Sequence, residues 1–417
     1  MKDMLGRQDL MQAGEALGLI LKLLPLKVPR EVFLPVEETL GMVTSRDIVS
    51  PEDLPAFARS TVDGYAVRAA DTFGASEAAP AYVNLSGEIF MGEKPGFVLM
   101  KGSACKMPTG GMLPDGADAV VMFEHVQPVD KTMIEVLRPA APGENVIQAG
   151  EDVKKGATVI AGGHRLRPQD IGACAGIGIT EVHVYERPAV SIISTGDEIM
   201  PAGSSLEAGQ VRDINSCVLS GMISEAGCLP RKKGIFRDEY DMIRAVVESS
   251  MGDSDVILLT GGTSVGIKDM IARVIDDIGN PGVVFHGVSL KPGKPMIGGI
   301  VEGIPVFGLP GHPAAVGVCF DVFVRPVLKV LTGCRDKLVA YRTAPVKARL
   351  SKNVASAQGR EEHVRVSIEE KEDGLWAIPV LGKSGLITTL VKADGTFVIP
   401  INKNGIETGE VVDVRLF

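Results

Sequence analysis

The chain has 417 residues, which at about 150 residues per domain predicts roughly three domains and leaves ample length for several buried cores. Hydrophobic residues make up 45% and charged residues 23%, and this composition excludes a globally disordered chain. The net charge is −9 and there is no long Lys/Arg run, so the basic surface of a nucleic-acid-binding protein is excluded.

Compartment and membrane association follow from the cysteines and the apolar runs. The six cysteines form no CxxC pair and are too sparse for a disulfide scaffold, which favours a reducing compartment. The first residues lack the order of a signal peptide, and no run approaches the ~18 apolar residues that span a bilayer. We therefore expect a cytoplasmic protein with neither nucleic acid nor a membrane as a partner.

The N-terminal part is predicted to consist of a helix, extended segments and a β-rich unit. Apolar residues at helical spacing over 9–24, ended by Pro25, predict an amphipathic helix. Short extended segments follow, and the turn-rich stretch 51–143 predicts a small β-rich unit. A second glycine-rich tract at 149–163 and a helix near 168–177 predict a connector or an elongated β-rich arm.

From residue 188 the pattern alternates between strands and helices. Apolar runs of buried-strand length are expected at 189–194, 255–259 and 304–309. Helices are expected at about 213–227, 238–251, 268–278 and 313–332. Such alternation predicts a parallel, doubly wound sheet. The last ~85 residues lose the alternation and predict a small β-domain with turns such as Asp373-Gly374.

Three loops at predicted strand ends are the first candidates for a binding site, because ligands of parallel α/β sheets bind outside the carboxyl ends of the strands. They cover 194–198 (STGDE), 260–266 (TGGTSVG) and 309–313 (LPGHP). The second exposes backbone amides ahead of a helix, which suits a phosphate group, although it lacks the Gly-Lys-Ser/Thr ending of a Walker A loop. A plain glycine-rich turn is the alternative interpretation.

Charged residues near these loops could bind an anion or a cation. Lys291 and Lys294 lie in a proline-stiffened segment, KPGKP, which suits phosphate or another oxyanion; a solvated turn is the alternative. Glu198, Asp238 and Asp269 could hold Mg²⁺ if the loops converge, since this cation prefers oxygen ligands. Each acid alone is also typical of a helix start.

Three further segments look structural when they are considered in isolation. Asp63 precedes a glycine in a turn of the Asx type, Thr109 belongs to a glycine turn, and His312 is expected to pack a loop.

Taken together, the ordered motifs change this interpretation. They are 60–68 (STVDGYAVR), 108–110 (PTG) with 116–121 (GADAVV), 150–152 (GED), 194–198, 261–266 with Asp269, 291–295 and 308–313 (GLPGHP). The set resembles the molybdopterin molybdenumtransferase (MoeA) family, which is related to the gephyrin E domain. The resemblance extends over essentially the whole chain, and the shared order of seven motifs makes it specific.

The resemblance implies a multidomain α/β plus β protein that forms an elongated homodimer. Its parts would be a discontinuous linker and dimerisation domain (1–50 and 144–187), an inserted β-rich domain (51–143), a three-layer parallel molybdopterin-binding-like α/β domain (188–333) and a C-terminal β-barrel (334–417). Each cleft would combine the α/β domain of one subunit with the inserted domain of the other, which would bring Asp63 and Thr109 to the phosphate loop.

The implied reaction is the Mg²⁺-dependent insertion of molybdate into adenylylated molybdopterin with release of AMP. The implied phosphate contacts are Gly261, Gly262, Thr263, Ser264 and Gly266. Asp269 and Glu198 would hold Mg²⁺, with Asp63 and Asp238 nearby, and Lys291 and Lys294 would neutralise oxyanion charge. The substrate loop and the C-terminal wall of the cleft would be supplied by Pro310, Gly311, Pro313, Arg360 and Ser384. Molybdopterin adenylyltransferase and molybdoenzyme-maturation proteins are the partner enzymes that the resemblance implies.

Three departures from the family pattern bear on affinity and on the choice between molybdate and tungstate. Ile147, Gln148 and Ala149 stand where many relatives carry arginines, Gly287 stands where relatives often have a lysine, and His312 occupies a position that is commonly Asn.

Two other functions remain open at this point. The α/β domain also resembles that of the adenylyltransferases that act one step earlier, but the inserted domain with its STVDGYAV motif argues against that activity. A scaffold that stores or delivers cofactor without turnover is the second alternative. The joint presence of Asp63, Glu198, Asp269 and Lys291 argues against it.

Overall fold

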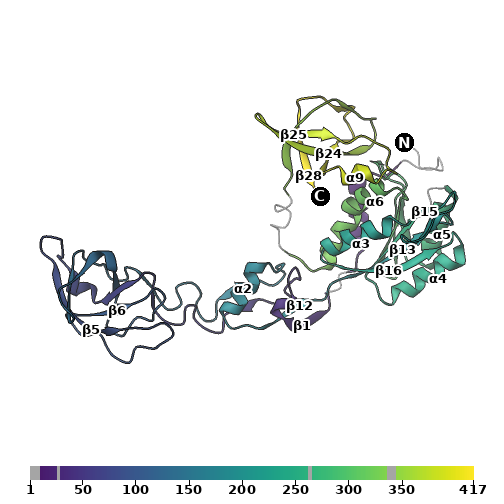
Figure 1. The fold of residues 1–417 in the computed structure, drawn as a ribbon. Coiled ribbons are helices and arrows are strands. Elements are labelled where there is room, and N and C mark those ends of the chain that lie inside the picture. Colours follow the sequence, from purple (N-terminus) through teal and green to yellow (C-terminus); the bar gives the residue numbers. More distant parts are fainter. Residues whose placement is uncertain (1–9, 26–28, 262–264, 336–343) are drawn as a thin grey trace.

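The computed structural model describes residues 10–25, 29–261, 265–335 and 344–417. The chain is elongated, with a β-rich unit at one end, a slender middle part, and the α/β and C-terminal β elements at the other end (Figure 1). No described helix is long and apolar enough to cross a bilayer.

The slender middle part joins the outward and return paths of the chain through three antiparallel strand pairs. They are β1 (Glu31–Pro35) with β12 (Glu181–Tyr185), β2 (Ile48–Val49) with β11 (Thr158–Ile160), and β3 (Arg59–Ser60) with β10 (Val146–Ile147). Helix α2 (Pro168–Gly176), which matches the predicted helix near 168–177, packs over these strands in a small apolar core around Leu166 and Cys174.

The β-rich unit at the far end is a six-stranded sheet in the order β7-β4-β6-β5-β9-β8. Its strands are β4 (Gly64–Val67), β5 (Ala81–Glu88), β6 (Ser103–Met107), β7 (Ala119–Met122), β8 (Val126–Pro128) and β9 (Met133–Val136). Short 3₁₀ helices are η1 (Val36–Glu38) in the middle part, and η2 (Ala69–Thr72) and η3 (Phe123–His125) in this unit. The predicted β-rich character is confirmed.

The α/β part has a six-stranded sheet in the order β16-β13-β17-β21-β20-β18. Its strands are β13 (Ala189–Thr195), β16 (Leu229–Phe236), β17 (Val256–Gly261), β18 (Gly282–His286), β20 (Ile297–Val301) and β21 (Ile304–Leu309). Helix α3 (Asn215–Glu225) and the helices after β21 cover one face, while α4 (Tyr240–Met251) and α5 (Val265–Ile278) cover the other, each over its own apolar core. The three-layer arrangement is therefore confirmed.

The sheet is not wholly parallel, which corrects the expectation. β16, β13, β17 and β21 are parallel, but β20 runs antiparallel to both β21 and β18. β20 and β21 are joined by Glu302 and Gly303, which both have positive φ (48° and 81°). This is the geometry of a tight hairpin turn, which the Glu-Gly pair did not reveal because Asn-Gly is the usual signal.

The predicted helix at 313–332 is divided into three segments. α6 (Pro313–Cys319) and α7 (Arg325–Leu331) flank η4 (Phe320–Val324), which is π-helical. Pro326 has no N–H to donate to the preceding turn, so the helix cannot continue regularly there.

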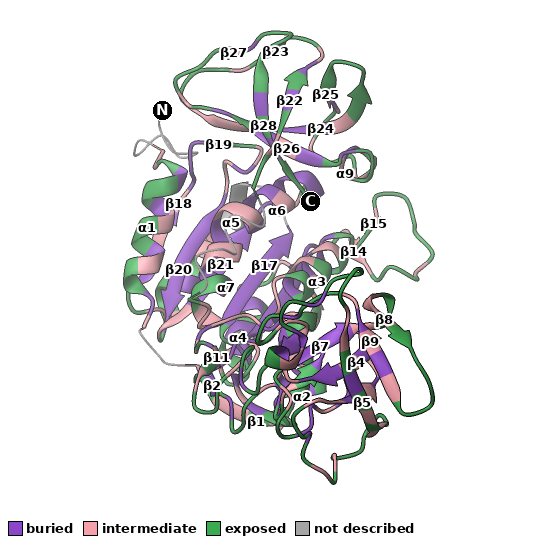
Figure 2. Cartoon of the chain, turned by 90° about the vertical axis from the view of Figure 1, so that its left-hand side faces the viewer, coloured by how far each residue is buried: buried purple, intermediate pink, exposed green. Residues whose placement is uncertain are grey.

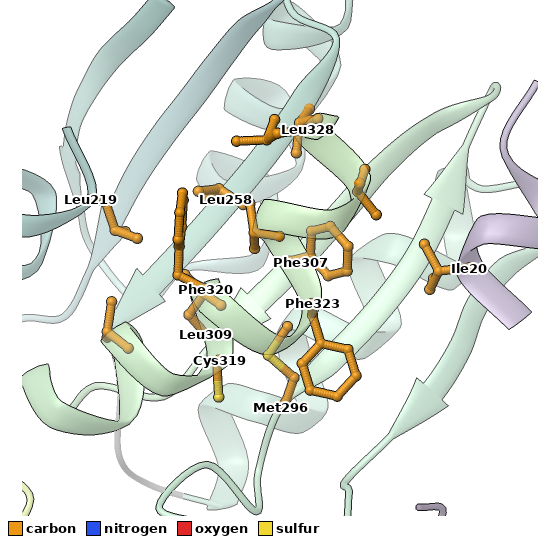
Figure 3. Close-up of a cluster of buried hydrophobic side chains, with 14 of the residues drawn as sticks. Ile20, Leu219, Leu258, Met296, Phe307, Leu309, Cys319, Phe320, Phe323 and Leu328 are labelled. Atoms are coloured by element: carbon orange, nitrogen blue, oxygen red, sulfur yellow. The ribbon is translucent and has the colours of Figure 1, made fainter. Parts of the chain in front are cut away.

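Helix α1 (Ala13–Leu23) lies against β18, β20 and η4 rather than in the middle part of the molecule. Its buried face, including Ile20, joins Phe307 and Phe323 in the largest apolar core (Figure 3). The segment 1–50, which the resemblance assigns to the discontinuous domain, thus contributes a helix to the α/β core.

The C-terminal strands close into a five-stranded barrel, as the resemblance implied. The closed order is β22-β25-β24-β26-β28 and back to β22. The strands are β22 (Val346–Leu350), β24 (Glu361–Lys371), β25 (Gly374–Pro379), β26 (Gly395–Ile399) and β28 (Val411–Leu416). The predicted turn at Asp373-Gly374 joins β24 to β25.

One short strand connects the barrel to the α/β part, and the other small elements lie within the two parts. Strand β19 (Leu290–Lys291) pairs in parallel with β24, so that the lysine-rich segment is attached to the barrel. The remaining elements are β14 (Ile199–Met200), β15 (Val211–Arg212), β23 (Val354–Ala355), β27 (Gly405–Ile406) and helix α9 (Thr388–Val391). Figure 2 shows α9 and β26 above α6, with the buried strands β17 and β21 in the sheet below.

Candidate functional site

The three loops singled out in the sequence follow neighbouring parallel strands. Thr195 at the end of β13 pairs in register with Gly261 at the end of β17, and Thr260 pairs with Leu309 at the end of β21. The carboxyl ends of these strands therefore lie at one edge of the sheet, where ligands of parallel sheets bind.

Gly261 is required by the close approach of β13. Its φ is +144°, and a Cβ at this position would lie 1.7 Å from the carbonyl oxygen of Thr195. Only glycine fits such a position. Gly262, Thr263 and Ser264 lie outside the described residues, and Gly266 lies in the first turn of α5. Their implied role as a phosphate loop stays a prediction.

Asn215, at the start of α3, links two of the loops and was not singled out in the sequence. Its Nδ2 donates to Thr260 Oγ1 at 2.9 Å and to the Gly311 carbonyl oxygen at 2.8 Å. An Asn at the start of a helix looks like an ordinary cap in the sequence, and only the contacts reveal this second role.

Asp238 lies near two other carboxylates beyond the end of β16. Burial raises the pKa of Asp238, and the neighbouring Asp197 and Glu198 raise it further. The Oδ1 atom of Asp238 is buried and has no hydrogen-bond partner among the residues that the structure describes. Glu198 folds back over Gly196, where a Cβ would lie 2.9 Å from its Oε2. Hydrogen bonds from the Thr195 side chain and the Asp197 backbone oppose this shift, but three acidic side chains at one edge of the sheet still favour a nearby cation.

A complete metal-ligand set is not found in the described part of the chain. No group of three or more His, Cys, Asp or Glu side chains converges there in a metal-binding arrangement. Asp269 is half-buried in the second turn of α5. The expected pairing of Asp269 with Glu198 around Mg²⁺ stays a prediction.

A cavity of about 680 Å³ lies between the α/β part and the barrel. The predicted residues that line it are Lys291, Lys294, Pro310, Gly311, Arg360 and Ser384. The volume is in the range of ordinary small-molecule sites. Segments more than 70 residues apart in the sequence thus meet around one space.

Positive charge dominates this cavity. Lys294 has no ion-pair partner among the described residues, and Arg360 has a buried Nε without a hydrogen-bond partner. Lys291 differs from the expectation, because its Nζ lies 2.8 Å from Oε1 of Glu362 and its charge is already balanced. Lys294 and Arg360 are therefore the better candidates for an anion.

His312 connects the larger cavity to a smaller one of about 240 Å³. Its Nδ1 lies 2.9 Å from Ser384 Oγ, so the side chain ties the loop after β21 to the barrel, as the loop-packing interpretation expected. The smaller cavity is lined by Glu198, Gly261, Gly311 and Pro313, and the two cavities share Gly311 and His312. The two cavities are therefore adjacent and together make up the candidate site.

Asp63 and Thr109 form a separate cluster in the β-rich unit. Asp63 Oδ1 accepts hydrogen bonds from the Thr109 amide at 2.8 Å and from its hydroxyl at 3.1 Å. These bonds lower the pKa of Asp63, the backbone bond most strongly. Within one chain the β-rich unit is at the opposite end of the molecule from the α/β part (Figure 1). The structure of a single chain therefore does not bring Asp63 to the strand ends.

Comparison with known proteins places this geometry in a family. The model "MoeA N-terminal region (domain I and II)" matches residues 11–178, "Probable molybdopterin binding domain" matches 191–330, and "MoeA C-terminal region (domain IV)" matches 347–417. The molybdopterin molybdenumtransferase of Bacillus subtilis is 32% identical over 91% of this chain and 88% of its own. The chain belongs to the MoeA family.

Two further relatives agree with this assignment. A molybdopterin molybdenumtransferase of Haemophilus influenzae is 30% identical over 97% of this chain and 98% of its own length. A solved molybdopterin biosynthesis MoeA protein from Pyrococcus horikoshii superposes with a TM-score of 0.84 at 33% identity, covering 98% of this chain and 100% of that one. The MoeA architecture therefore extends from end to end.

Proposed function

We propose that this chain is a transferase of molybdenum cofactor biosynthesis that inserts molybdate into adenylylated molybdopterin and releases AMP. The observation that carries the proposal is the whole-chain match to molybdopterin molybdenumtransferases, together with two adjacent cavities between the strand ends of the α/β part and the barrel. The cavity supplies space for a small molecule and cationic groups for an oxyanion.

The residues of the cavity are suited to placing reactants rather than to moving protons. The oxyanion must meet two sulfur atoms while the phosphates are held in place, so orientation supplies much of the rate. Lys294 and Arg360 would hold the oxyanion by charge, and the segment 309–313 would shape the wall beside it. Lys291 would act through its ion pair with Glu362 by fixing the lysine-rich segment to the barrel.

Mg²⁺ fits the carboxylates at the strand ends. The buried, unpartnered Oδ1 of Asp238 and the adjacent Glu198 offer oxygen ligands, with Asp269 as the third implied contributor. When bound, Mg²⁺ would polarise the phosphoanhydride that links AMP to molybdopterin.

The predicted homodimer would complete the site. The separation of Asp63 and Thr109 from the α/β part of the same chain supports the implied arrangement, in which a second copy supplies them. The domain borders 1–50 with 144–187, 51–143, 188–333 and 334–417 form part of this proposal.

The two alternative functions are less favoured. The adenylyltransferase alternative does not account for the MoeA regions that this chain matches before and after the α/β domain. A storage scaffold would not need the carboxylate group around Asp238 in addition to the cationic cavity. Cytoplasmic location, the partner enzymes and the effect of Gly287 and of the missing arginines at 147–149 stay predictions.

The decisive experiment is incubation of the purified protein with adenylylated molybdopterin, Mg²⁺ and either molybdate or tungstate. AMP release and active cofactor are followed together, and the ratio of the two rates gives the oxyanion preference. AMP release that requires an oxyanion is expected. Absence of AMP with both oxyanions would support the storage function, and pyrophosphate release from ATP and molybdopterin would support adenylylation.

A further inference from the structure

A second cavity, separate from the strand ends, lies between the helical layer and the barrel. It has a volume of about 510 Å³ and is enclosed by α3, by the helices α6 to α7, by α9 and by the barrel strands β24, β26 and β28. Figures 1 and 2 show α9 and the barrel facing α6 on this side of the molecule.

The walls of this cavity are mostly apolar. Aliphatic and aromatic side chains come from the helices and the last strand, among them Met222, Val318, Leu390 and Phe417. Val391 at its rim is 80% exposed. A mostly apolar space of this size is typical of a small-molecule site.

A buried arginine lies in the wall of the cavity. Arg365 in β24 is only 8% exposed, yet its Nε has no hydrogen-bond partner. One hydrogen bond is described for its guanidinium, from Nη2 to the Gly382 carbonyl oxygen at 3.2 Å. Among the described residues no carboxylate pairs with it, and burial lowers the pKa of Arg365. A buried, unpaired guanidinium costs free energy that an anion would recover.

The acidic residues around the cavity are already engaged. Asp321 Oδ1 accepts from Arg325 Nε at 2.7 Å, and Glu225 Oε2 accepts from Nη2 of the same arginine at 3.1 Å. The other basic side chain of the cavity, Arg415, is exposed. The wall thus holds three arginines against these two carboxylates, so its net side-chain charge is positive once the exposed Arg415 is counted.

We propose that this cavity binds a small apolar molecule that carries one anionic group, a carboxylate or sulfonate, with the apolar body among the helices and the anion on Arg365. The size and walls of the cavity select the apolar body. The unpaired guanidinium selects the charge. The inference does not depend on the proposed transferase activity.

The test uses the full-length protein and two fluorescent probes. 8-Anilinonaphthalene-1-sulfonate is apolar and anionic, and N-phenyl-1-naphthylamine is a neutral probe of similar shape. We expect saturable binding of the sulfonate. The variant Arg365→Met retains an unbranched side chain but removes the charge. It should weaken sulfonate binding at least tenfold while changing binding of the neutral probe less than threefold.

Two further variants locate the bound probe. Arg365 also lines the larger cavity, whereas Lys383 lines only that cavity. Lys383→Met is therefore the matched control, and it should leave sulfonate binding unchanged. Val391→Glu places a negative charge at an exposed position on the rim and should weaken sulfonate binding without affecting folding. Circular dichroism and thermal unfolding confirm that each variant folds.

The outcomes separate the proposal from its competitors. Loss of sulfonate binding in Lys383→Met would show that the anion sits in the larger cavity and would overturn the proposal. Equal sulfonate affinity in Arg365→Met and the parent, or no saturable binding at all, would overturn it too. If Arg365→Met does not fold, the Val391→Glu variant decides the question, because an unchanged sulfonate affinity in this variant would by itself overturn the proposal.

Discussion

Asp238 lies at a position where ionisation is disfavoured. Burial, Asp197 and Glu198 all raise its pKa, and its Oδ1 has no partner. Such an arrangement reduces the stability of the protein alone and suits a bound cation.

The variant Asp238→Asn should therefore stabilise the metal-free protein at neutral pH. Because the folded-state pKa is raised, the penalty is present above that pKa and disappears as the pH falls through it. We expect a higher midpoint of thermal unfolding for the variant at pH 7, and a difference that shrinks towards pH 4. Equal midpoints at pH 7 would contradict the charge repulsion around Asp238.

Asp269 is the second acidic residue whose replacement tests the proposed function. The variant Asp269→Asn should fold normally but lower the rate of AMP release by roughly 100-fold or more, the size of effect expected when a group that stabilises developing charge is removed. Asp241→Asn, an exposed carboxylate in the first turn of α4, is the matched control. An unchanged rate in Asp269→Asn would remove Asp269 from the site.

The sequence predicted which motif residues line the cavity better than it predicted the contacts that these residues make. The cavity lining by Lys294, Arg360 and Ser384 agrees with what the resemblance implied. The ion pair of Lys291 with Glu362 could not be predicted, since the partner is 71 positions away and on another domain. The double hydrogen bond of Asn215 was missed for the same reason.

At the scale of single elements, helix α2 depends on one buried acid. Burial alone would raise the pKa of Asp170, but Arg167 and His164 donate hydrogen bonds of 2.8 Å to its Oδ2 and hold the pKa well below its usual value of 3.8. The Arg167 backbone amide donates to the same oxygen, which caps the helix. The middle part of the molecule is thus stabilised by a charge network as well as by a small core.

Asp170→Asn should destabilise this part by about 2–3 kcal/mol at pH 7, because it removes a buried carboxylate that accepts charge-assisted hydrogen bonds from Arg167 and His164. The stabilising effect of a lowered pKa is present above 3.8 and is lost as the pH falls below that value. Urea unfolding at pH 7 and at pH 3, with hydrogen exchange of the α2 amides, measures both effects. Asp152→Asn, an exposed acid of the same part, serves as the control. A difference that stays constant down to pH 3 would contradict the pKa assignment.

Periodic apolar patterns predicted the strands and helices well, whereas the tight turn and the irregular helical segment were not predicted. Strands β13, β17 and β21 and helices α3 to α5 match expected segments because continuous apolar runs and 3.6-residue spacing are local signals. The hairpin at Glu302-Gly303 lacks the usual Asn-Gly signal, and it was therefore missed. The π-helical segment at 320–324 lies just before Pro326, a local signal that the prediction of one helix over 313–332 did not use.

At the scale of the whole molecule, the proposed dimer predicts that two inactive variants restore each other. In a mixed dimer of Asp63→Asn and Asp269→Asn, one cleft carries both changes and the other carries neither. Denaturing and refolding the two variants together should therefore restore AMP release. Each mixed dimer has one intact cleft, so its activity should reach up to about half that of a parent dimer.

The control for this experiment is the double variant Asp63→Asn/Asp269→Asn mixed with each single variant, which leaves no intact cleft. Subunit exchange is verified by differently tagged copies recovered in one complex. Complete exchange without recovery of activity would show that Asp63 and Asp269 do not act across the interface.

The amino-acid sequence by itself determined the order of the motifs, the alternation of strands and helices after residue 188, and the β character of both ends, since each is a local or linear property. Only the tertiary structure decided which side chains share a cavity, that Lys291 is already paired, and that Asp63 is remote from the strand ends of its own chain. It also decided that Arg365 is buried with no carboxylate partner among the described residues. The reason is physical: charge balance, burial and unsatisfied hydrogen bonds are set by neighbours in space, and those neighbours are distant in the sequence.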